Sequence, residues 1–422
     1  MPQPGADVDA SFGTFDYIVA HGVYSWVPEP VRDALLRVCR ENLPPQGVAY
    51  VSYNTCPGWY LRAPVRDLLT FHAEGVDDPH ERVRRGRELL AVVAANPLHP
   101  DSAWAKLIRD EADLLAKEGD YYLFHEHLEP DNHPVYFHQF LAHAQRHDLQ
   151  FLAESQRHTT LALLPPPLNA KLTEVAANPL ELEQYVDYAS GRSFRRSLLV
   201  HDEVPLDPRH APLAVVGMLL CGTARPAVAD ADVTTVDELE FVNEDGATAT
   251  VTAPVVKAAL TTLYETWPRV WRFEELLDAA GARVGQTREQ AAPTLARALA
   301  ALFQANFVGL HSHVPPFVLK PGKRPETTPL IRLQAQTGVG VCNRRHKLVE
   351  LATFDRAVLA LLDGSRDRPA LIERLAALVG QGELGLAQDG QPVREPEAVR
   401  RTLTAELDES LTRLAQAMVL IG

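Results

Sequence analysis

The feature that most constrains the fold of this chain is a strand, helix, strand pattern near its start. The apolar run FDYIVA at 15–20 is rich in β-branched and aromatic residues and predicts a buried strand. Apolar residues at helical spacing over 31–39 predict a helix, which the turn LPPQG at 43–47 ends before a second strand at 48–53. This βαβ unit predicts a parallel sheet with a right-handed crossover.

Two loops rich in aromatic and polar residues follow these strands, AHGVYSW at 20–26 and NTCPGW at 54–59. In open parallel sheets, ligands bind beyond the carboxyl ends of the strands, and both loops lie at those ends. The loops are therefore candidates for a binding site. From the spacing alone, ordinary loop chemistry around a structural sheet is an equally weighted alternative.

The motifs FDYI and WV, followed by a helix and by LPPQGVAYVSYN, resemble the fourth and fifth strands of class I S-adenosylmethionine-dependent methyltransferases. AHGVYSWVP and SYNTCPGW are more closely similar to methyltransferases that carry a methyltransferase regulatory domain. The rickettsial outer-membrane-protein lysine methyltransferases have a similar layout. The segments at 125–155, 183–201 and 361–375 also resemble this family, so the resemblance covers most of the chain.

The start of the chain lacks two parts that the resemblance implies. Class I methyltransferases open with a strand and a Gly-rich turn that hold the cofactor, and an acidic residue after the next strand binds its ribose. Residues 1–14 contain neither an apolar strand nor a GxGxG motif. We therefore expect the first three strands, about a hundred residues, to be missing and the site for S-adenosylmethionine to be incomplete. A truncated gene model is the favoured explanation, and a cofactor-free relic is the alternative.

The predicted fold class is α/β: a partial Rossmann-like sheet of a class I methyltransferase with a helical insertion, followed by two α+β winged-helix-like domains. The expected boundaries are 1–155 for the partial methyltransferase domain with its insertion at about 60–118, 156–203 for a helical regulatory segment, 204–328 for the middle winged-helix-like domain and 329–422 for the C-terminal one.

Local patterns predict the elements within these boundaries. An aromatic strand is expected at 121–128 and another strand at 149–154, as the closing strands of the sheet. Helix packing is the expected role of the segment at 183–201. The turn NEDG at 243–246 predicts a hairpin, and the three helices after it resemble a winged helix. Because neither winged-helix module is strongly basic, protein recognition is favoured over DNA binding.

Composition bounds the function further. The formal net charge is −14, so general binding to nucleic acid or to an anionic membrane is not expected. The four cysteines form no CxxC pair, so neither a disulfide framework nor a zinc site is indicated. No apolar run reaches the length of a membrane span, and no signal peptide precedes Phe15. The chain is therefore expected to be a cytoplasmic protein.

A group of histidines suggests a metal hypothesis. His125 and His127 would share one face of the predicted strand, which suits chelation, and His133 and His138 follow closely. However, no HExxH pair is present, and the carboxylates show no ligand spacing. No metal ligand is therefore predicted, and a polar loop that lines the cleft, or a structural role, is preferred.

The favoured function is an S-adenosylmethionine-dependent methyltransferase that acts on protein lysine. The alternative is a cofactor-free protein-binding scaffold derived from a methyltransferase. Aromatic rings at the strand ends would shape a channel for the stem of a lysine side chain, and a ring face would attract the methylammonium product. A histidine at the same place could shuttle a proton. The candidate catalytic residues are His21, Tyr24, Trp26 and Asn54; the cofactor candidates are Ala20, His21 and Gly22; the substrate candidates are Tyr24, Trp26, Tyr53, Trp59, His125 and His127. The resemblance also implies a protein substrate and a homodimer formed through the helical insertion.

Overall fold

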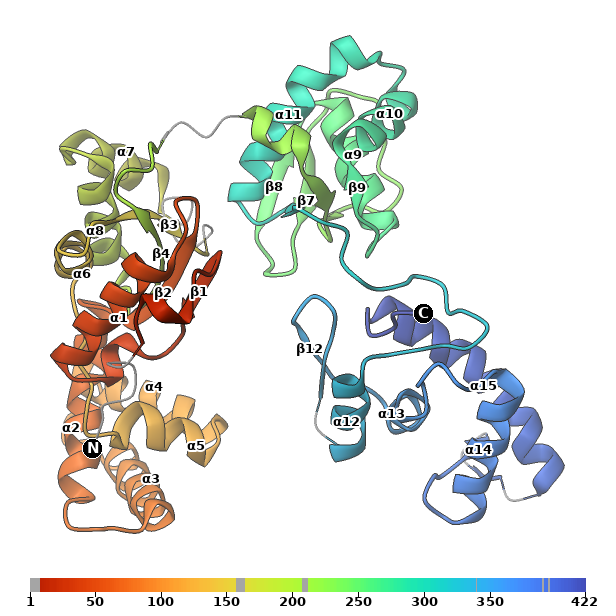
Figure 1. Cartoon of the computed structure of the whole chain (residues 1–422), viewed down its shortest axis with the longest axis horizontal. Helices are drawn as coiled ribbons and strands as arrows, with labels where there is room; N and C mark the ends of the chain where they lie inside the picture. The colour runs from red at the N-terminus through yellow and green to blue at the C-terminus, as the bar shows by residue number, and fades with distance from the viewer. Residues whose placement is uncertain (1–7, 157–163, 207–211, 339, 389–390, 394) are drawn as a thin grey trace. The chain divides into compact units, whose positions relative to one another are not determined.

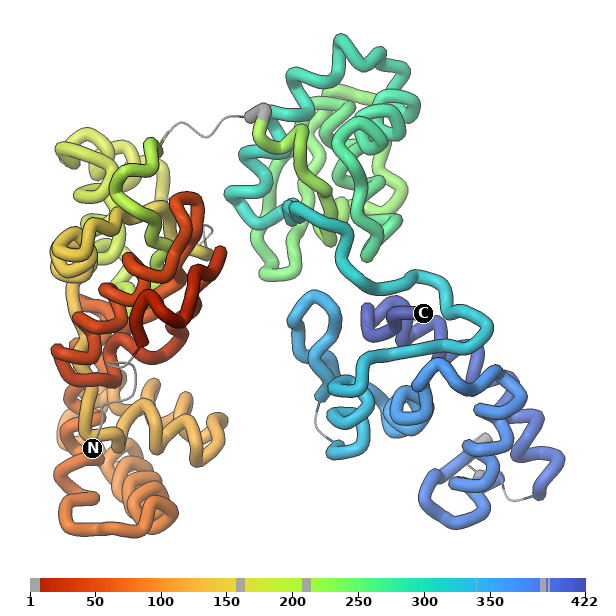
Figure 2. Tube along the Cα trace, in the orientation of Figure 1, coloured from red at the N-terminus to blue at the C-terminus, as the bar shows by residue number. Residues whose placement is uncertain are grey.

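The computed structural model describes residues 8–156, 164–206, 212–338, 340–388, 391–393 and 395–422. The chain divides into two compact units, Met1–Arg209 and His210–Gly422. Each unit contains two hydrophobic cores of its own. Figure 2 traces the path of the chain within each unit.

The first unit is built on a four-stranded sheet in the order β1-β2-β4-β3 (Figure 1). The strands are β1 (Tyr17–Ala20), β2 (Val48–Asn54), β3 (Leu149–Glu154) and β4 (Phe194–His201). β1 and β2 are parallel and are joined by helix α1 (Glu29–Asn42), which confirms the predicted βαβ unit. β4 runs antiparallel to both β2 and β3.

Strand β4 (Phe194–His201) corrects the expectations of helix packing at 183–201 and of a helical segment at 156–203. The second range does hold helices α7 (Pro166–Val175) and α8 (Pro179–Ser190), but its last part pairs with two strands of the sheet. Alternate side chains are buried in the first half of β4, as the period of a strand requires. The pattern is hard to recognise because Arg195 occupies one of the buried positions.

The core of the sheet combines α1, the strands and helix α6 (Phe137–Gln145). Leu36 and Cys39 of α1 are fully buried together with Phe140 of α6 and Val51 of β2. Burial of apolar surface is the main stabilising term, and here it fixes both helices against the sheet. This packing determines where the loops after the strands begin.

A helical insertion between β2 and α6 has a hydrophobic core of its own. Its elements are α2 (Ala63–His72), α3 (Pro79–Ala95), α4 (Ala103–Lys117), α5 (Asp120–Leu123) and the π-helical turn η4 (Phe124–Leu128). The side chain of Ser102 accepts a hydrogen bond from the Ala105 N–H and so caps the start of α4.

The strand expected at 121–128 is wrong, because α5 and η4 occupy this range. Leu123 and Leu128 both pack into the core of the insertion. The helical turns bury both leucines against α2 and α3, so tertiary packing overrides the β-propensity of the aromatic residues.

The second unit begins with a module whose hairpin was predicted. Strands β7 (Leu239–Val242) and β8 (Thr248–Val251) pair on either side of the turn, and Gly246 adopts a φ of 80° that favours glycine. The module further contains η7 (Pro212–Gly217), β5 (Leu219–Cys221), β6 (Arg225–Pro226), α9 (Pro254–Glu265), β9 (Trp271–Arg272), α10 (Phe273–Val284), α11 (Arg288–Gln304) and β10 (Gly309–His311). Its three helices share one core with the strands.

The last module of the second unit has a separate core. Its elements are α12 (Pro329–Thr337), β11 (Val341–Cys342), β12 (Leu348–Val349), α13 (Thr353–Ala360), α14 (Arg368–Gly380), β13 (Ala387–Gln388), β14 (Gln391–Pro392) and α15 (Pro396–Gln416). The mixed α/β architecture predicted from the sequence is thus confirmed. Among the described helices, none combines the length and the apolar character that crossing a bilayer requires.

Candidate functional site

The carboxyl ends of β1 and β2 lie at the same edge of the sheet, because the two strands are parallel. Ala20 at the end of β1 pairs with Val51, and β2 continues to Asn54. His21 follows Ala20 at the end of β1, and its Nδ1 lies 3.0 Å from the Tyr50 hydroxyl oxygen and 3.2 Å from the Ser52 hydroxyl oxygen. The Gly22 N–H donates to the same Ser52 oxygen at 2.8 Å. These contacts hold the loop that contains the cofactor candidates against β2.

Asn54, the last residue of β2, ties together three segments that are distant in sequence. Its N–H donates to the Ser25 hydroxyl oxygen at 2.9 Å, and its side-chain amide donates to Asn132 Oδ1 at 3.2 Å. The Ser25 carbonyl in turn accepts a hydrogen bond from the His133 N–H at 2.7 Å. Because Asn54 is buried and uses its polar groups in this way, the structure gives it a positioning role at the strand ends.

Four rings form a row beside this edge, which we call the aromatic wall: Trp59, Trp26, His125 and Tyr121. The centroid of the Trp26 ring lies 6.4 Å from that of Trp59 and 4.4 Å from that of His125. Tyr121 stacks on His125 at a centroid distance of 6.2 Å. Trp59 is buried, whereas Tyr121 is 82% exposed, so the wall runs from the interior to the solvent.

Tyr121 was not among the residues predicted for the site. It lies four positions before His125, a spacing that brings side chains together on a helix. Interpreting the segment as helical would therefore have identified this contact from the sequence.

Tyr24 and Tyr53 lie in the core rather than at the open edge, with exposed fractions of 2% and 1%. The Tyr24 hydroxyl lies 2.8 Å from His143 Nδ1, and the Tyr53 hydroxyl lies 3.1 Å from the Ser197 hydroxyl oxygen. Phe140 packs against both rings. Burial raises the pKa of Tyr24 to about 12 and also raises the pKa of Tyr53. Because both rings are buried, Tyr24 and Tyr53 are not placed to contact a substrate directly, contrary to the prediction. Their contacts favour a role in packing and in positioning neighbouring side chains.

His127 also differs from its expected place on a cleft. Its side chain is fully buried, and its Nε2 lies 3.2 Å from Glu111 Oε1, outside hydrogen-bond geometry. Arg62 approaches the same carboxylate at 3.9 Å and donates to the Tyr122 hydroxyl at 3.3 Å. Burial favours the neutral form of Glu111, yet His127 and Arg62 outweigh it and lower the pKa of this carboxyl group. His125 and His127 therefore do not share a strand face, since one joins the aromatic wall and the other lies in the interior.

A buried charge cluster supports β4, and it was missed in the sequence. Arg195 is fully buried and forms ion pairs with Asp187 and Glu183 of α8 and with Glu154 of β3. Its guanidinium lies 3.9 Å from the centroid of the Phe137 ring. Burial raises the pKa of Asp187 and of Glu154, although Arg195 acts in the opposite direction. The cluster fixes the strand between β2 and β3.

Within the described ranges, one group of side chains has the donor atoms and the spacing to hold a metal ion: Asp33, His143 and His147. It lies on α1 and at the end of α6, and it contains none of the four histidines weighed in the sequence.

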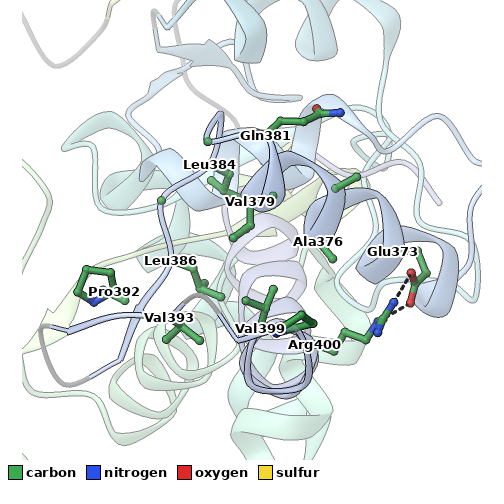
Figure 3. A pocket seen from close by; sticks show the side chains of 16 residues that line it. Glu373, Ala376, Val379, Gln381, Leu384, Leu386, Pro392, Val393, Val399 and Arg400 are labelled. Atoms are coloured by element: carbon green, nitrogen blue, oxygen red, sulfur yellow. Dashed lines mark hydrogen bonds and ion pairs between the residues drawn. The ribbon is translucent and has the colours of Figure 1, made fainter.

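A groove of about 1010 Å³ lies in the last module of the second unit, between α14 and α15 (Figure 3). Apolar side chains such as Val379, Leu386 and Val399 line it. The ion pair of Arg400 with Glu373, 2.9 Å between Nε and Oε1, lies beside it. None of the predicted site residues lines this groove.

Comparisons with known proteins place this architecture among the methyltransferases. The family model described as "Predicted methyltransferase regulatory domain" matches residues 119–201, and the one described as "PKMT, C-terminal winged helix domain" matches residues 323–419. The chain belongs to the family of PKMT-type proteins that combine these two domains. PKMT denotes a protein lysine methyltransferase.

Relatives cover most of the chain. The uncharacterized protein RP789 of Rickettsia prowazekii (strain Madrid E) is 30% identical over 98% of this chain and 76% of its own length. The uncharacterized protein RP028 of the same organism is 40% identical over 33% of this chain and 56% of its own length. The solved structure of PKMT2 from Rickettsia typhi, 26% identical, matches with a TM-score of 0.86 over 100% of this chain and 83% of that protein. PKMT2 in complex with AdoHcy matches with a TM-score of 0.84 over 100% of this chain and 84% of that protein.

Proposed function

We propose that this chain belongs to an S-adenosylmethionine-dependent methyltransferase that methylates lysine side chains of proteins. The observation that carries this proposal is the likeness of the whole chain to PKMT2, a protein solved in complex with AdoHcy. AdoHcy is the molecule that S-adenosylmethionine becomes when its methyl group is transferred. The loops at the carboxyl ends of β1 and β2, the edge where ligands bind in parallel sheets, are consistent with such a site.

On the cofactor side, we assign contacts to Ala20, His21 and Gly22. They follow the end of β1, and the Ser52 hydroxyl holds them in place through the Gly22 N–H and the His21 imidazole. His21 is exposed, so its imidazole is available to a ligand or to a proton from the acceptor amine.

On the acceptor side, we assign the aromatic wall. A lysine side chain has an apolar stem that packs well against rings, and a methylated ammonium group is attracted to a ring face. Methyl transfer is an in-line displacement, so the protein mainly positions a neutral amine near the donor methyl group. Trp26 and His125 are the central members of the wall and the first choice for this positioning.

Two measurements test the proposal. The chain covers 83% of PKMT2, so both measurements use a protein of the full length of that relative. Isothermal titration of this full-length protein should detect binding of AdoHcy, and methyl transfer from S-adenosylmethionine to a panel of proteins should place methyl groups on lysine, identified by mass spectrometry. Trp26→Ala should reduce the transfer, whereas His72→Ala, an exposed histidine of α2, is the matched control. A folded full-length protein that neither binds AdoHcy nor transfers methyl groups would instead support the protein-binding scaffold.

We also infer that the helical insertion forms a contact between two copies of the chain. Large apolar side chains are exposed on it, at Phe71, Val92, Leu98 and Trp104. Exposed apolar groups of this size favour association. Light scattering should detect a dimer that Leu98→Glu weakens; an unchanged mass for this variant would rule out this contact.

A further inference from the structure

A second cluster of chemically active side chains lies on the helices that flank the sheet. Asp33 belongs to α1, His143 to the last turn of α6, and His147 follows α6 after a short turn. His143 Nε2 and His147 Nε2 both face Asp33 Oδ1, at 3.3 Å and 2.9 Å. The spacing of four residues between the histidines places both rings on one side of the helix end.

The donor atoms match the coordination preferences of a divalent transition metal. Two imidazole nitrogens and one carboxylate oxygen form a common ligand set for Zn²⁺, with three protein ligands and a fourth position for water. Metal–ligand distances near 2.0–2.2 Å place the donors of a tetrahedral site about 3.3 Å apart. The two distances to Asp33 are close to that value, and all three donor atoms lie within 4.8 Å of one another.

A buried hydroxyl group orients one of the ligands. The Tyr24 hydroxyl lies 2.8 Å from His143 Nδ1 and is in the protein core. A hydroxyl oxygen can accept the Nδ1 proton, which leaves Nε2 of the same ring free to bind a metal ion. Metal-binding histidines usually have such a partner, because it fixes the orientation and the tautomer of the ring.

The surroundings favour the protonation states that metal binding needs. Burial lowers the pKa of His143, and Arg146 acts in the same direction, so this imidazole is held in its neutral form. Without a metal ion, hydrogen bonds from His147 and His143 lower the pKa of Asp33 against the effect of burial and keep it a carboxylate. A bound ion would take the place of the protons on the two Nε2 atoms. The Asp33 side chain is 55% exposed, so a metal ion and a water ligand have access from the solvent. The positive charges of Arg32 and Arg146 near Tyr24 act against a cation and reduce the affinity.

We propose that Asp33, His143 and His147 form a binding site for one divalent transition-metal ion of the zinc type. The ion would link α1 to α6. Through His143 and Tyr24, it would also stabilise the loop after β1, where the proposed methyltransferase site lies. This site is separate from the proposed methyl transfer and does not depend on it.

The experiment measures metal binding directly. The full chain is stripped with a chelator and titrated with Zn²⁺ by calorimetry, and Co²⁺ is added separately to record the absorption bands of a tetrahedral site. We expect one equivalent of Zn²⁺ with a dissociation constant in the micromolar range or below, and a rise of the thermal midpoint on binding.

Variants distinguish the proposed site from surface histidines. Asp33→Asn and His147→Gln should each weaken Zn²⁺ binding roughly tenfold or more, and Tyr24→Phe should weaken it about 10–100-fold. His72→Gln removes an exposed histidine outside the cluster and should bind as the wild type does. Circular dichroism confirms that each variant is folded. No uptake by the wild type, or uptake that Asp33→Asn and His147→Gln leave unchanged, would show that the three side chains are only an ion-paired cluster.

Discussion

Arg195 and Asp187 form a bidentate ion pair in which both side chains are fully buried: Nε lies 2.8 Å from Oδ2, and Nη2 lies 2.8 Å from Oδ1. The pair joins β4, the strand between β2 and β3, to helix α8. Burying two charges is costly, so such a pair is not necessarily better than an apolar contact. The loss of one partner is nevertheless severe, because the other charge stays buried without its best partner. Without Arg195, Asp187 would keep only Arg192, whose Nε lies 3.1 Å from Oδ1.

We therefore predict that Arg195→Ala lowers the free energy of unfolding by about 3–5 kcal/mol. Asp187 and Glu154 would remain buried without their main cation. Urea denaturation measures the change. The control is Arg84→Ala, which removes an exposed ion pair with Glu81 and should cost less than about 1 kcal/mol. Equal losses in the two variants would contradict the prediction.

The pKa of Glu111 gives a prediction on pH. This pKa is lower in the folded chain than the ordinary value of 4.5, because His127 and Arg62 outweigh the effect of burial. The ionised group therefore stabilises the fold above pH 4.5, and this contribution is lost as the pH falls through the lower, folded-state pKa.

Glu111→Gln should accordingly lower the free energy of unfolding by roughly 1–3 kcal/mol at pH 7. The difference from the wild type should shrink as the pH is lowered below 4.5. Thermal unfolding of both proteins from pH 7 down to below the folded-state pKa of Glu111 measures it. Glu88→Gln, at an exposed position, is the control and should change the free energy of unfolding little at any pH in this range. A difference that stays constant over this range would argue against a stabilising role for the Glu111 charge.

The sequence predicted the parts of the fold that depend on local periodicity. The βαβ unit over 17–54 was identified because the apolar period changes from a strand to a helix and back. The hairpin at 243–246 was identified from its turn residues. The loops after β1 and β2 were correctly placed at one edge, since the order of a βαβ unit determines that edge.

The features that the sequence did not predict depend on contacts between residues that are distant in the chain. From the sequence alone, Arg195 is expected on the surface, and only the folded chain brings Glu154, Glu183 and Asp187 around it. For this reason β4 was not predicted as a strand. In the proposed metal site, Asp33 precedes His143 by 110 residues, so no local spacing connects the two. Burial is likewise a property of the folded chain, and it removed Tyr24, Tyr53 and His127 from the accessible edge.

The exposed edge strand gives a prediction on association. In the described part of the chain, β1 is the outer strand of its sheet, and Tyr17 and Val19 on it are 76% and 68% exposed. Edge strands with apolar side chains tend to pair with other chains, and lysine on the edge prevents this. Tyr17→Lys combined with Val19→Lys should reduce aggregation in sedimentation at high concentration. Leu98→Glu tests the helical insertion separately, and aggregation that only this variant relieves would exclude the edge of β1.

The final prediction concerns Trp26, whose ring contacts His125 and Trp59 in the aromatic wall. If the wall positions the acceptor lysine, Trp26→Ala in a protein of the full length of PKMT2 should lower the single-turnover rate of methyl transfer about 100-fold, because small misplacements of reacting groups are costly in rate. The thermal midpoint should change little, since Trp26 is only partly buried.

The rival explanation is that Trp26 is a packing residue whose loss would cost roughly 3–5 kcal/mol of stability. Measuring the thermal midpoint and the rate per folded molecule on the same variant separates the two roles. Tyr264→Ala, which removes an exposed ring on α9 outside the proposed site, is the control and should leave both quantities near the wild-type values. A large drop in the thermal midpoint of Trp26→Ala with an unchanged rate would remove Trp26 from the proposed site, because its ring would then support the fold without contacting the acceptor.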